Sequence, residues 1–316
     1  MKRRSFVKLG AAGSMALQFP HIFGAYTSEK MGEIPKRILG KTGEEVTVLG
    51  FGGIALKNNG PEFASELIAA AFDRGIRYYD IAPSYGDSQE LLGPALKPYR
   101  KESFLACKTQ ARDQQGSEDE LHESLDLLKT DHIDLYQFHA LSKMEDLDQI
   151  FGPGGAIETF QKARDAGKIR FIGFSAHNEE VALKAMDLFD FDSILYPINC
   201  VCWYNGDFAP RVLKKARKND MGIMAIKAIA KNRISGDDNP YPNLWYVPFE
   251  EDKLIEKSLQ FTLSKDITGT VHAGDSVFMK KTLQFIEGRK EFSAPDKDEI
   301  LSMIKDVKPI FSHPEA

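Results

Sequence analysis

Four polar side chains with acid–base chemistry recur along the sequence at intervals typical of a repeating strand–helix unit. Asp80, Lys108 and His139 each end a short apolar run, and 28 and 31 positions separate successive members. Tyr85 follows Asp80 by five positions, in a segment that contains Pro83. A carboxylate, an ammonium, a phenol and an imidazole can together deliver a proton to a reacting oxygen and stabilise the charge that forms there.

Reduction of a carbonyl group is the chemistry that uses all four. Hydride arriving at carbon leaves negative charge on oxygen, which then needs a proton donor. Tyr85 is a weak acid, and a neighbouring Lys108 ammonium makes its hydroxyl a better donor. Asp80 would hold Lys108 charged and in place, while His139 would orient the carbonyl oxygen. The alternative is a structural ion pair with an ordinary tyrosine and histidine, but four such residues at repeat spacing favour a shared site.

Short apolar runs alternate with amphipathic stretches from about residue 36 onward. Eight strands alternating with helices predict an α/β fold with a parallel sheet, and eight such units close into a (β/α)8 TIM barrel. The carboxyl ends of all strands then share one face, which would bring the four side chains together. The expected strands are residues 49–51, 78–80, 103–108, 133–139, 171–175, 194–199, 222–227 and 269–272.

Two further features shape this expectation. Arg37–Leu39 and Val46–Val48, joined by a glycine-containing turn, predict an N-terminal β-hairpin ahead of the barrel. The structural competitor is an open doubly wound sheet, which would carry a glycine-rich dinucleotide loop after its first strand. The segment Gly50–Gly53 lacks the spacing of that loop, which favours the barrel.

The segments around the four residues resemble the aldo-keto reductase family. Residues 79–86, read YDIAPSYG, resemble the family's signature around its catalytic aspartate and tyrosine, and residues 106–109 and 133–139 resemble its lysine and histidine strands. Residues 167–175 resemble the segment whose serine contacts the nicotinamide. The similarity covers about residues 36–285 and implies a barrel that binds NADP without a separate dinucleotide-binding domain.

The resemblance implies roles for individual residues. Asp80, Tyr85, Lys108 and His139 match the family's catalytic tetrad. Gly53 and Ser175 match cofactor contacts, and Asn199 stands where the family usually has a glutamine beside the nicotinamide. Ala176 replaces an asparagine that many relatives carry, so this end of the cofactor site departs from the family pattern.

The distal end of the expected cofactor site carries further candidates. Lys227 stands where a lysine of bacterial relatives is placed to reach the pyrophosphate, and a solvated lysine at a strand end is the alternative. Gly274 and Asp275 align with the phosphate loop, and Lys280 could meet an adenosine phosphate. Because the acidic Asp275 repels phosphate and can accept ribose hydroxyls, NAD is possible beside NADP.

The N-terminus has the character of an export signal. Residues 1–9 are basic and a short, weakly apolar run follows, too short for a stable membrane span. Arg3 and Arg4, with Phe6 and Lys8, resemble a twin-arginine signature, which predicts the twin-arginine translocation machinery as a partner and a periplasmic location. A disordered N-terminus on a cytoplasmic protein is the alternative. We therefore expect a leader over residues 1–30 and a barrel over residues 36–316.

The composition of the chain indicates which classes of partner and ligand to expect. The chain of 316 residues has a formal charge of −5, which gives no basic footprint for nucleic acid. Cys107, Cys200 and Cys202 lie in apolar, strand-like surroundings without metal-ligand spacing, so we expect core thiols and no metal. The stretch from 231 to 249 is rich in Asn, Pro and aromatic residues, which fits either a sugar-like or ring-shaped substrate or structural cover for the barrel.

Three functions remain open at this point: an NAD(P)H-dependent oxidoreductase acting on a carbonyl or alcohol, an exported sugar oxidoreductase that retains its cofactor, and a non-catalytic NADP-binding barrel. An intact tetrad favours an enzyme, since a pure binder has no need of a proton donor paired with a lysine. Loss of turnover with unchanged cofactor binding after Tyr85→Phe would identify the enzyme.

Overall fold

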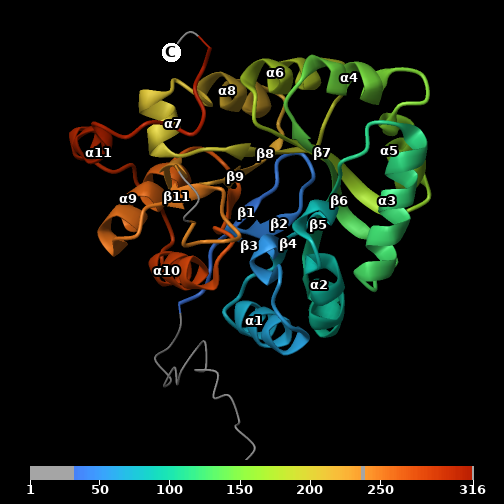
Figure 1. Cartoon of the computed structure of the whole chain (residues 1–316), viewed down its shortest axis with the longest axis horizontal. Helices are drawn as coiled ribbons and strands as arrows, with labels where there is room; N and C mark the ends of the chain where they lie inside the picture. The colour runs from blue at the N-terminus through green and yellow to red at the C-terminus, as the bar shows by residue number, and fades with distance from the viewer. Residues whose placement is uncertain (1–31, 236–238, 315–316) are drawn as a thin grey trace, which may run out of the picture. The chain divides into compact units, whose positions relative to one another are not determined.

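Eight parallel strands close into a barrel in the order β12-β3-β4-β5-β6-β7-β8-β9 (Figure 1). The computed structural model describes residues 32–235 and 239–314, and the chain from Gly32 onward forms one unit. The closed order confirms the predicted (β/α)8 barrel and rules out the open doubly wound sheet. Its strands are β3 (Leu49–Gly52), β4 (Tyr78–Asp80), β5 (Phe104–Thr109), β6 (Ile133–Leu141), β7 (Ile169–Ala176), β8 (Ser193–Pro197), β9 (Gly222–Ile226) and β12 (Gly269–Val271).

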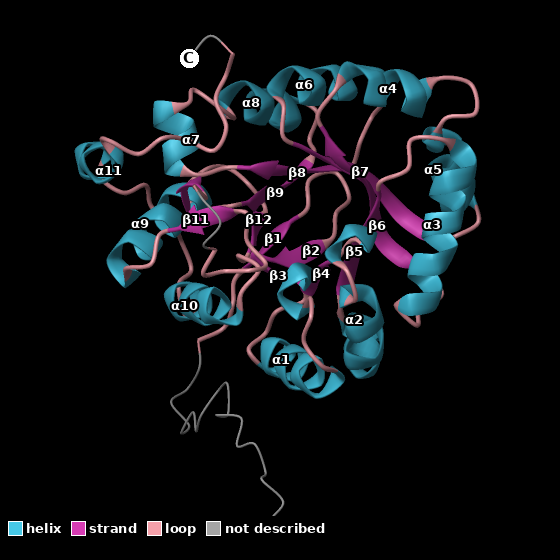
Figure 2. Cartoon of the chain, viewed as in Figure 1, coloured by secondary structure: helices cyan, strands magenta, loops and turns pink. Residues whose placement is uncertain are grey.

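Helices surround the barrel on its outside (Figure 2). Helices alternate with the strands, as the alternating pattern predicted. Asp113 caps the N-terminus of α3 by accepting from the Gly116 amide. The α-helices are α1 (Pro61–Asp73), α2 (Ser88–Leu96), α3 (Gln114–Leu127), α4 (Met144–Phe151), α5 (Ala156–Asp165), α6 (Glu179–Leu188), α7 (Cys200–Asn205), α8 (Pro210–Lys218), α9 (Asp252–Leu263), α10 (Ser276–Ile286) and α11 (Lys297–Ile304).

The barrel interior is filled by side chains. Strands covered on both faces read as continuous apolar runs, and β5, for example, is buried at every position. The aromatic rings of Tyr78 and Phe104 stack with centroids 5.5 Å apart inside the barrel. Leu135, Leu195 and Met224 join them in one buried cluster. A packed interior leaves the chemistry to the carboxyl ends of the strands.

Two small antiparallel sheets lie outside the barrel. Strands β1 (Lys36–Ile38) and β2 (Glu45–Thr47) form the predicted N-terminal hairpin. Strands β10 (Ala230–Arg233) and β11 (Tyr246–Pro248) pair in a region for which no strand was predicted. Sequence reasoning missed this pair because only three positions are paired, and prolines and asparagines lie among them. Such a short stretch shows too little alternation of apolar and polar residues to indicate a strand.

The three cysteines are free and buried, as expected for core thiols. The prediction of strand-like surroundings is wrong for Cys200 and Cys202, which begin the helix α7. Asn199 precedes them and its side chain accepts from the Cys202 amide, so an N-cap starts a helix where the apolar run suggested a strand.

The expected leader, residues 1–30, lies outside the described residues. Among the helices that the structure describes, none is long and apolar enough to cross a membrane.

Candidate active site

A buried ion pair joins two neighbouring strands at the carboxyl end of the barrel. Lys108 Nζ on β5 donates a 2.6 Å hydrogen bond to Asp80 Oδ2 at the end of β4, and a second of 3.0 Å to the Ile81 carbonyl. Both side chains are almost fully buried. Burial by itself would lower the pKa of Lys108, but the nearby Asp80 and Tyr85 raise it above its ordinary value, so the side chain stays an ammonium.

Tyr85 meets this ammonium from a separate segment. Residues Pro83–Tyr85 form a short 3-10 helix after β4, and the Tyr85 hydroxyl lies 3.5 Å from Lys108 Nζ. Burial raises the pKa of Tyr85 and Lys108 partly offsets that rise, so the hydroxyl keeps its proton at neutral pH. Lys108 lowers the pKa of Tyr85 in the predicted direction, but the loss of water around the phenol has the larger effect. The site therefore holds a neutral phenol beside a cation, which is a proton donor.

His139 completes the group from β6. Its ring lies edge-on to the Tyr85 ring at a centroid distance of 5.9 Å, and its Nδ1 lies 3.3 Å from Ser84 Oγ. Burial lowers the pKa of His139 to about 3, with Lys108 and Lys227 adding to the effect. The imidazole is therefore neutral near pH 7, with one ring nitrogen able to donate a hydrogen bond.

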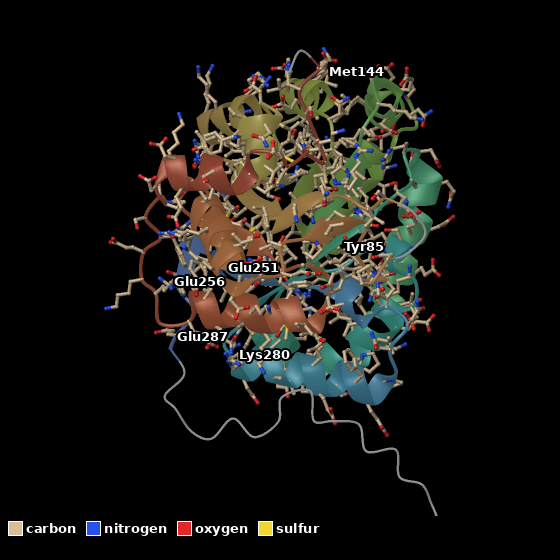
Figure 3. The ribbon with its side chains drawn as sticks, turned by 60° about the vertical axis from the view of Figure 1, so that its left-hand side comes forward. Tyr85, Met144, Glu251, Glu256, Lys280 and Glu287 are labelled. Atoms are coloured by element: carbon tan, nitrogen blue, oxygen red, sulfur yellow. The ribbon has the colours of Figure 1, made fainter. Side chains whose placement is uncertain are left out.

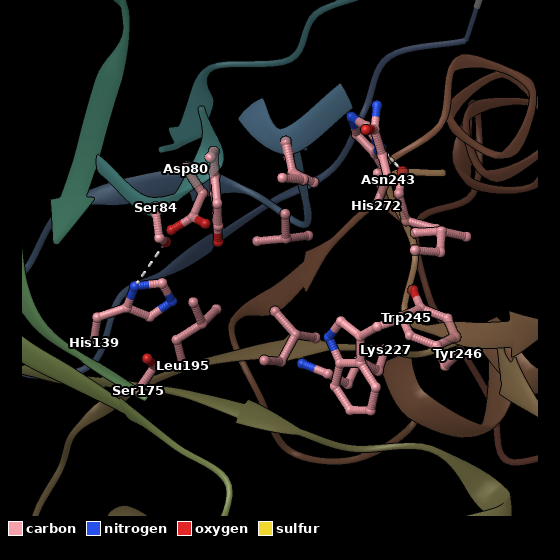
Figure 4. A pocket seen from close by; sticks show the side chains of 18 of the residues that line it. Asp80, Ser84, His139, Ser175, Leu195, Lys227, Asn243, Trp245, Tyr246 and His272 are labelled. Carbon is pink, nitrogen blue, oxygen red and sulfur yellow. Dashed lines mark hydrogen bonds between the residues drawn. The ribbon is translucent and has the colours of Figure 1, made fainter. Parts of the chain in front are cut away.

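The four side chains line one pocket of about 320 Å³, a size suited to a small ligand (Figure 4). Asp80, Ser84 and His139 lie on one side of the close-up, and Lys227 and Trp245 lie across from them. Apolar side chains make up most of the wall between the two groups, including Leu195, Ile226 and Leu244.

Of the predicted nicotinamide contacts, only Ser175 lines the pocket. Its hydroxyl oxygen accepts a 2.7 Å hydrogen bond from the Ala140 amide, which leaves its own proton for a ligand. Gly53 lies next to the pocket, and a Cβ there would come within 2.3 Å of Ile81 Cδ1 and 2.8 Å of the Asp80 carbonyl. Gly53 thus permits close packing against the strand of Asp80. Asn199 is buried outside the lining, and its Nδ2 has no partner among the described residues.

The predicted phosphate-binding residues are spread more widely. Gly274 lines the pocket, whereas Asp275 and Lys280 are not part of its wall. Asp275 caps α10, accepting a 2.8 Å hydrogen bond from the Val277 amide. Lys280 lies on α10, where Figure 3 labels it, and does not line the pocket. The structure brings the reaction-centre candidates together in the pocket, and Asp275 and Lys280 lie outside its lining.

Lys227 lines the pocket just after β9 and has a positive φ of 63°. Its Nζ lies 3.2 Å from His177 Nε2, and 5.2 Å from the centroid of the Trp245 ring. Burial lowers the pKa of Lys227 to about 7.

Several lining residues were not singled out as site residues from the sequence, among them Ser84, His177, Trp245 and His272. Ser84 sits inside the segment that we singled out, one position before Tyr85. His272 follows β12, its Nδ1 contacts the Ala273 carbonyl, and its Nε2 has no partner within the described ranges. Position at a strand end was the signal for His272, as it was for Asp80.

Across residues 32–235 and 239–314, no group of His, Cys, Asp and Glu is arranged to hold a metal ion.

The fold and the site together define a class: a (β/α)8 barrel with an Asp–Lys pair, a tyrosine and a histidine at the mouth. The particular family follows from comparison with known proteins. A family model described as the aldo/keto reductase family matches residues 48–254, about two thirds of the chain. The chain belongs to the aldo-keto reductase family of oxidoreductases.

Proteins of known sequence from other organisms are moderately similar. An aldo-keto reductase, YhdN, of Bacillus subtilis is 29% identical over 219 residues, which cover 62% of each chain. L-galactose dehydrogenase of Arabidopsis thaliana is 31% identical over 160 residues, which cover 46% of this chain and 49% of that protein. The chain thus matches between about half and three fifths of these relatives' length.

Solved structures of lower identity share the fold. An aldo-keto reductase from Bacillus halodurans in its holo form superposes with a TM-score of 0.68 at 22% identity, covering 90% of this chain and 99% of that one. A Klebsiella pneumoniae aldo-keto reductase in complex with NADPH gives a TM-score of 0.52 at 19% identity, covering 61% and 68%.

Proposed function

We propose that this protein is a nicotinamide-dependent oxidoreductase that interconverts a carbonyl and an alcohol, with Tyr85 as the proton donor in the direction of reduction. The observation that carries the proposal is the position of Lys108 Nζ, 2.6 Å from Asp80 and 3.5 Å from the Tyr85 hydroxyl. A neutral phenol held beside a cation gives up its proton as negative charge forms on the substrate oxygen, and the cation stabilises the phenolate left behind.

Each side chain has a separate task. Tyr85 donates the proton, and Lys108 stabilises the resulting charge. Asp80 keeps Lys108 charged within a buried site. Neutral His139 donates a hydrogen bond to the carbonyl oxygen and orients it toward Tyr85.

The residues of the pocket suit the nicotinamide end of a dinucleotide, which would supply the hydride when bound. His272, which lines the pocket, has an Nε2 that lacks a hydrogen-bond partner among the described residues. Ser175 contributes a hydroxyl to the pocket wall, and Gly274 contributes backbone without a side chain. We propose NADP(H) as the cofactor. Support comes from the NADPH complex of the Klebsiella structure and from a fission-yeast relative, 27% identical over 230 residues, whose name specifies NADP(+).

A direct test is titration of the purified protein with NADPH, followed by addition of a panel of aldehydes, ketones and sugars while absorbance at the nicotinamide band is recorded. The proposal requires saturable binding and oxidation of NADPH that depends on the carbonyl. A protein that binds neither NADPH nor NADH overturns it. A protein that binds NADPH and reduces none of the panel supports a non-catalytic binding barrel.

A sugar-type substrate and export form a more specific version of this function. Named relatives act on sugars: besides L-galactose dehydrogenase, a 6-dehydroglucose reductase of Novosphingobium aromaticivorans is 28% identical over 197 residues. The Trp245 ring, 48% exposed beside the pocket, offers a flat surface to a sugar. With the twin-arginine-like leader, this supports an exported sugar oxidoreductase that retains its cofactor through successive turnovers.

The location is tested by fractionating cells that express the intact chain and a variant with Arg3→Lys and Arg4→Lys. Export through the twin-arginine machinery predicts periplasmic protein that disappears in the double variant. Equal amounts in the cytoplasm for both chains contradict it. Nicotinamide dinucleotide bound to the periplasmic protein as isolated would support a retained cofactor.

A further inference from the structure

His272, which follows β12 at the carboxyl end of the barrel, carries a ring nitrogen without a partner among the described residues. The residue lines the pocket and is only 6% exposed, and its Nε2 forms no hydrogen bond within the described ranges. A buried acceptor that has lost water without gaining a donor destabilises the fold, and most such groups in proteins have a partner. Because His272 belongs to the pocket wall, a bound ligand can supply the missing donor.

Two neighbouring strands hold His272 in one position. Its backbone amide donates a 3.1 Å hydrogen bond to the Gly50 carbonyl, which extends the pairing of β12 with β3. Its imidazole lies edge-on to the Phe51 ring, with the centroids 5.1 Å apart. A Cβ at Gly52 would come within 2.9 Å of the His272 carbonyl, so the glycine makes room for this residue. His272 is therefore a rigid part of the pocket wall, and it lies across the pocket from His139 in Figure 4.

The tautomer of His272 follows from its other ring nitrogen. Nδ1 contacts the Ala273 carbonyl, which can only accept a hydrogen bond, so Nδ1 carries the proton. Burial lowers the pKa of His272 to about 4, and the contact with Ala273 offsets only part of that effect. The imidazole is therefore neutral at pH 7, and its Nε2 can only accept a hydrogen bond.

The surroundings of Nε2 restrict the kind of donor that a ligand can bring. Lys108 and Lys227 line the same pocket and disfavour a ligand ammonium there. Within the part of the chain that the structure describes, His272 belongs to no group of side chains that could hold a metal ion. The neutral donors of a nicotinamide dinucleotide and of an alcohol or sugar-like substrate are mainly hydroxyl groups. A ligand hydroxyl is therefore the donor that best suits Nε2.

We propose that His272 Nε2 forms a hydroxyl-recognition subsite of the pocket, which accepts a hydrogen bond from a hydroxyl group of the bound ligand. The inference rests on the proposed function only for the two sources of that hydroxyl, a polyhydroxylated substrate or the ribose of the cofactor. His272 touches the ligand and selects it, whereas the proton transfer belongs to Tyr85.

The test compares two substitutions of His272 with the parent chain. His272→Phe keeps a ring against Phe51 and removes the acceptor, whereas His272→Gln places a carbonyl oxygen near the position of Nε2. His122→Phe, exposed on α3, is the matched control. Affinity is measured for NADPH, for NADH and for the acetylpyridine analogue of NADPH, which keeps the ribose and lacks the amide NH2. The kcat/KM is measured for glyceraldehyde against propanal and for xylose against pentanal, and each substrate is compared with itself across the variants.

The two sources of the hydroxyl give different patterns. If the substrate supplies it, His272→Phe lowers kcat/KM for glyceraldehyde and xylose by about tenfold and does not lower it for propanal and pentanal. If the cofactor ribose supplies it, His272→Phe weakens NADPH, NADH and the acetylpyridine analogue by the same factor of about tenfold, and the substrate ratios stay constant. In both cases we expect His272→Gln to recover most of the loss.

Three results of this comparison overturn the proposal. The first is a His272→Phe chain with the affinities and substrate ratios of the parent. The second is a loss that His272→Gln shares in full, because it would depend on the ring and not on the acceptor. The third is a loss of affinity for NADPH and NADH that spares the acetylpyridine analogue, because the donor would then be the amide.

A measurement on the parent chain needs no substitution to fold. With 15N-labelled histidine, acceptance of a hydrogen bond moves the Nε2 resonance of His272 upfield, and the signal that His272→Gln lacks identifies it. We expect this shift on addition of NADPH or of xylose, and no shift with either ligand overturns the proposal. If the parent binds no nicotinamide dinucleotide, the proposed function fails separately. Xylose then decides alone: an upfield shift supports the subsite, and an unchanged signal overturns it.

Discussion

Lys108 Nζ lies 2.6 Å from Asp80 Oδ2, although 28 positions of sequence and the helix α2 separate the two residues. The strands β4 and β5 that carry them are hydrogen-bonded neighbours. Their pairing at the carboxyl end of the barrel gives the site a permanent cation, and this cation lies within reach of Tyr85 and its proton.

Breaking this pair from one side should destabilise the protein strongly. Asp80→Asn leaves the Lys108 ammonium buried without a counter-charge, and we expect a loss of about 3–5 kcal/mol in the free energy of unfolding. The double variant Asp80→Asn with Lys108→Met removes both charges, and we expect it to be more stable than Asp80→Asn alone. Urea unfolding measures the free energy of unfolding of each variant. If the loss in the double variant equals the sum of the losses in Asp80→Asn and Lys108→Met, the two side chains do not pair directly.

Removing the Tyr85 hydroxyl should abolish turnover and leave cofactor binding intact. Tyr85→Phe deletes the proton donor but keeps the ring against His139, so we expect the kcat of carbonyl reduction to fall by about 10²–10⁴-fold. NADPH titration and kcat measurement provide the two readouts. Tyr99→Phe, on the outer side of the barrel, is the control. A Tyr85→Phe enzyme with near-parent kcat would remove the phenol from the mechanism.

His139 should remain neutral throughout the range of ordinary assays. Its pKa in the folded protein is about 3, against about 6.5 in an unfolded chain. The unfolded chain therefore binds more protons between these values, and His139 lowers stability as the pH falls from 6.5 toward 3.

Urea unfolding at pH 7 and pH 4.5 tests this sign. Between pH 7 and pH 4.5, His139 takes up a proton in the unfolded chain but not in the folded protein. We expect His139→Gln to remove this difference and so to reduce the acid-induced loss in the free energy of unfolding by about 2 kcal/mol. His122→Gln, exposed on α3, is the control and should change little. If His139→Gln and the parent lose the same free energy of unfolding between pH 7 and pH 4.5, then His139 accepts a proton as readily in the folded protein as in the unfolded chain.

Asp275 should set part of the preference between NADP and NAD. Asp275→Asn removes the negative charge and keeps the cap on α10, because asparagine is an equally good N-cap. Loss of a repulsion of about 1 kcal/mol predicts an NADPH affinity about fivefold higher, with little gain for NADH. Titration with both nucleotides checks this, with Asp306→Asn as a control. Equal changes for the two nucleotides would place Asp275 away from the adenosine phosphate.

The sequence by itself determined the barrel and the reaction-centre residues. Strand runs and their spacing depend on local periodicity, and a closed parallel barrel brings every strand end to one face. Asp80, Lys108 and His139 could therefore be assigned to one site before any distance was known. Tyr85 followed because its segment is short and tied to β4.

Only the tertiary structure decided what depends on contacts between distant segments. The pKa of Tyr85 is raised and not lowered, because burial by the whole barrel mouth outweighs one neighbouring cation. Lys227 acquires its neighbour His177 from the segment after β7 and Trp245 from the segment before β11, and sequence spacing reveals neither contact. Gly53 packs against Asp80, and Lys280 lies outside the pocket lining, because side-chain direction and helix position arise from packing and not from local pattern.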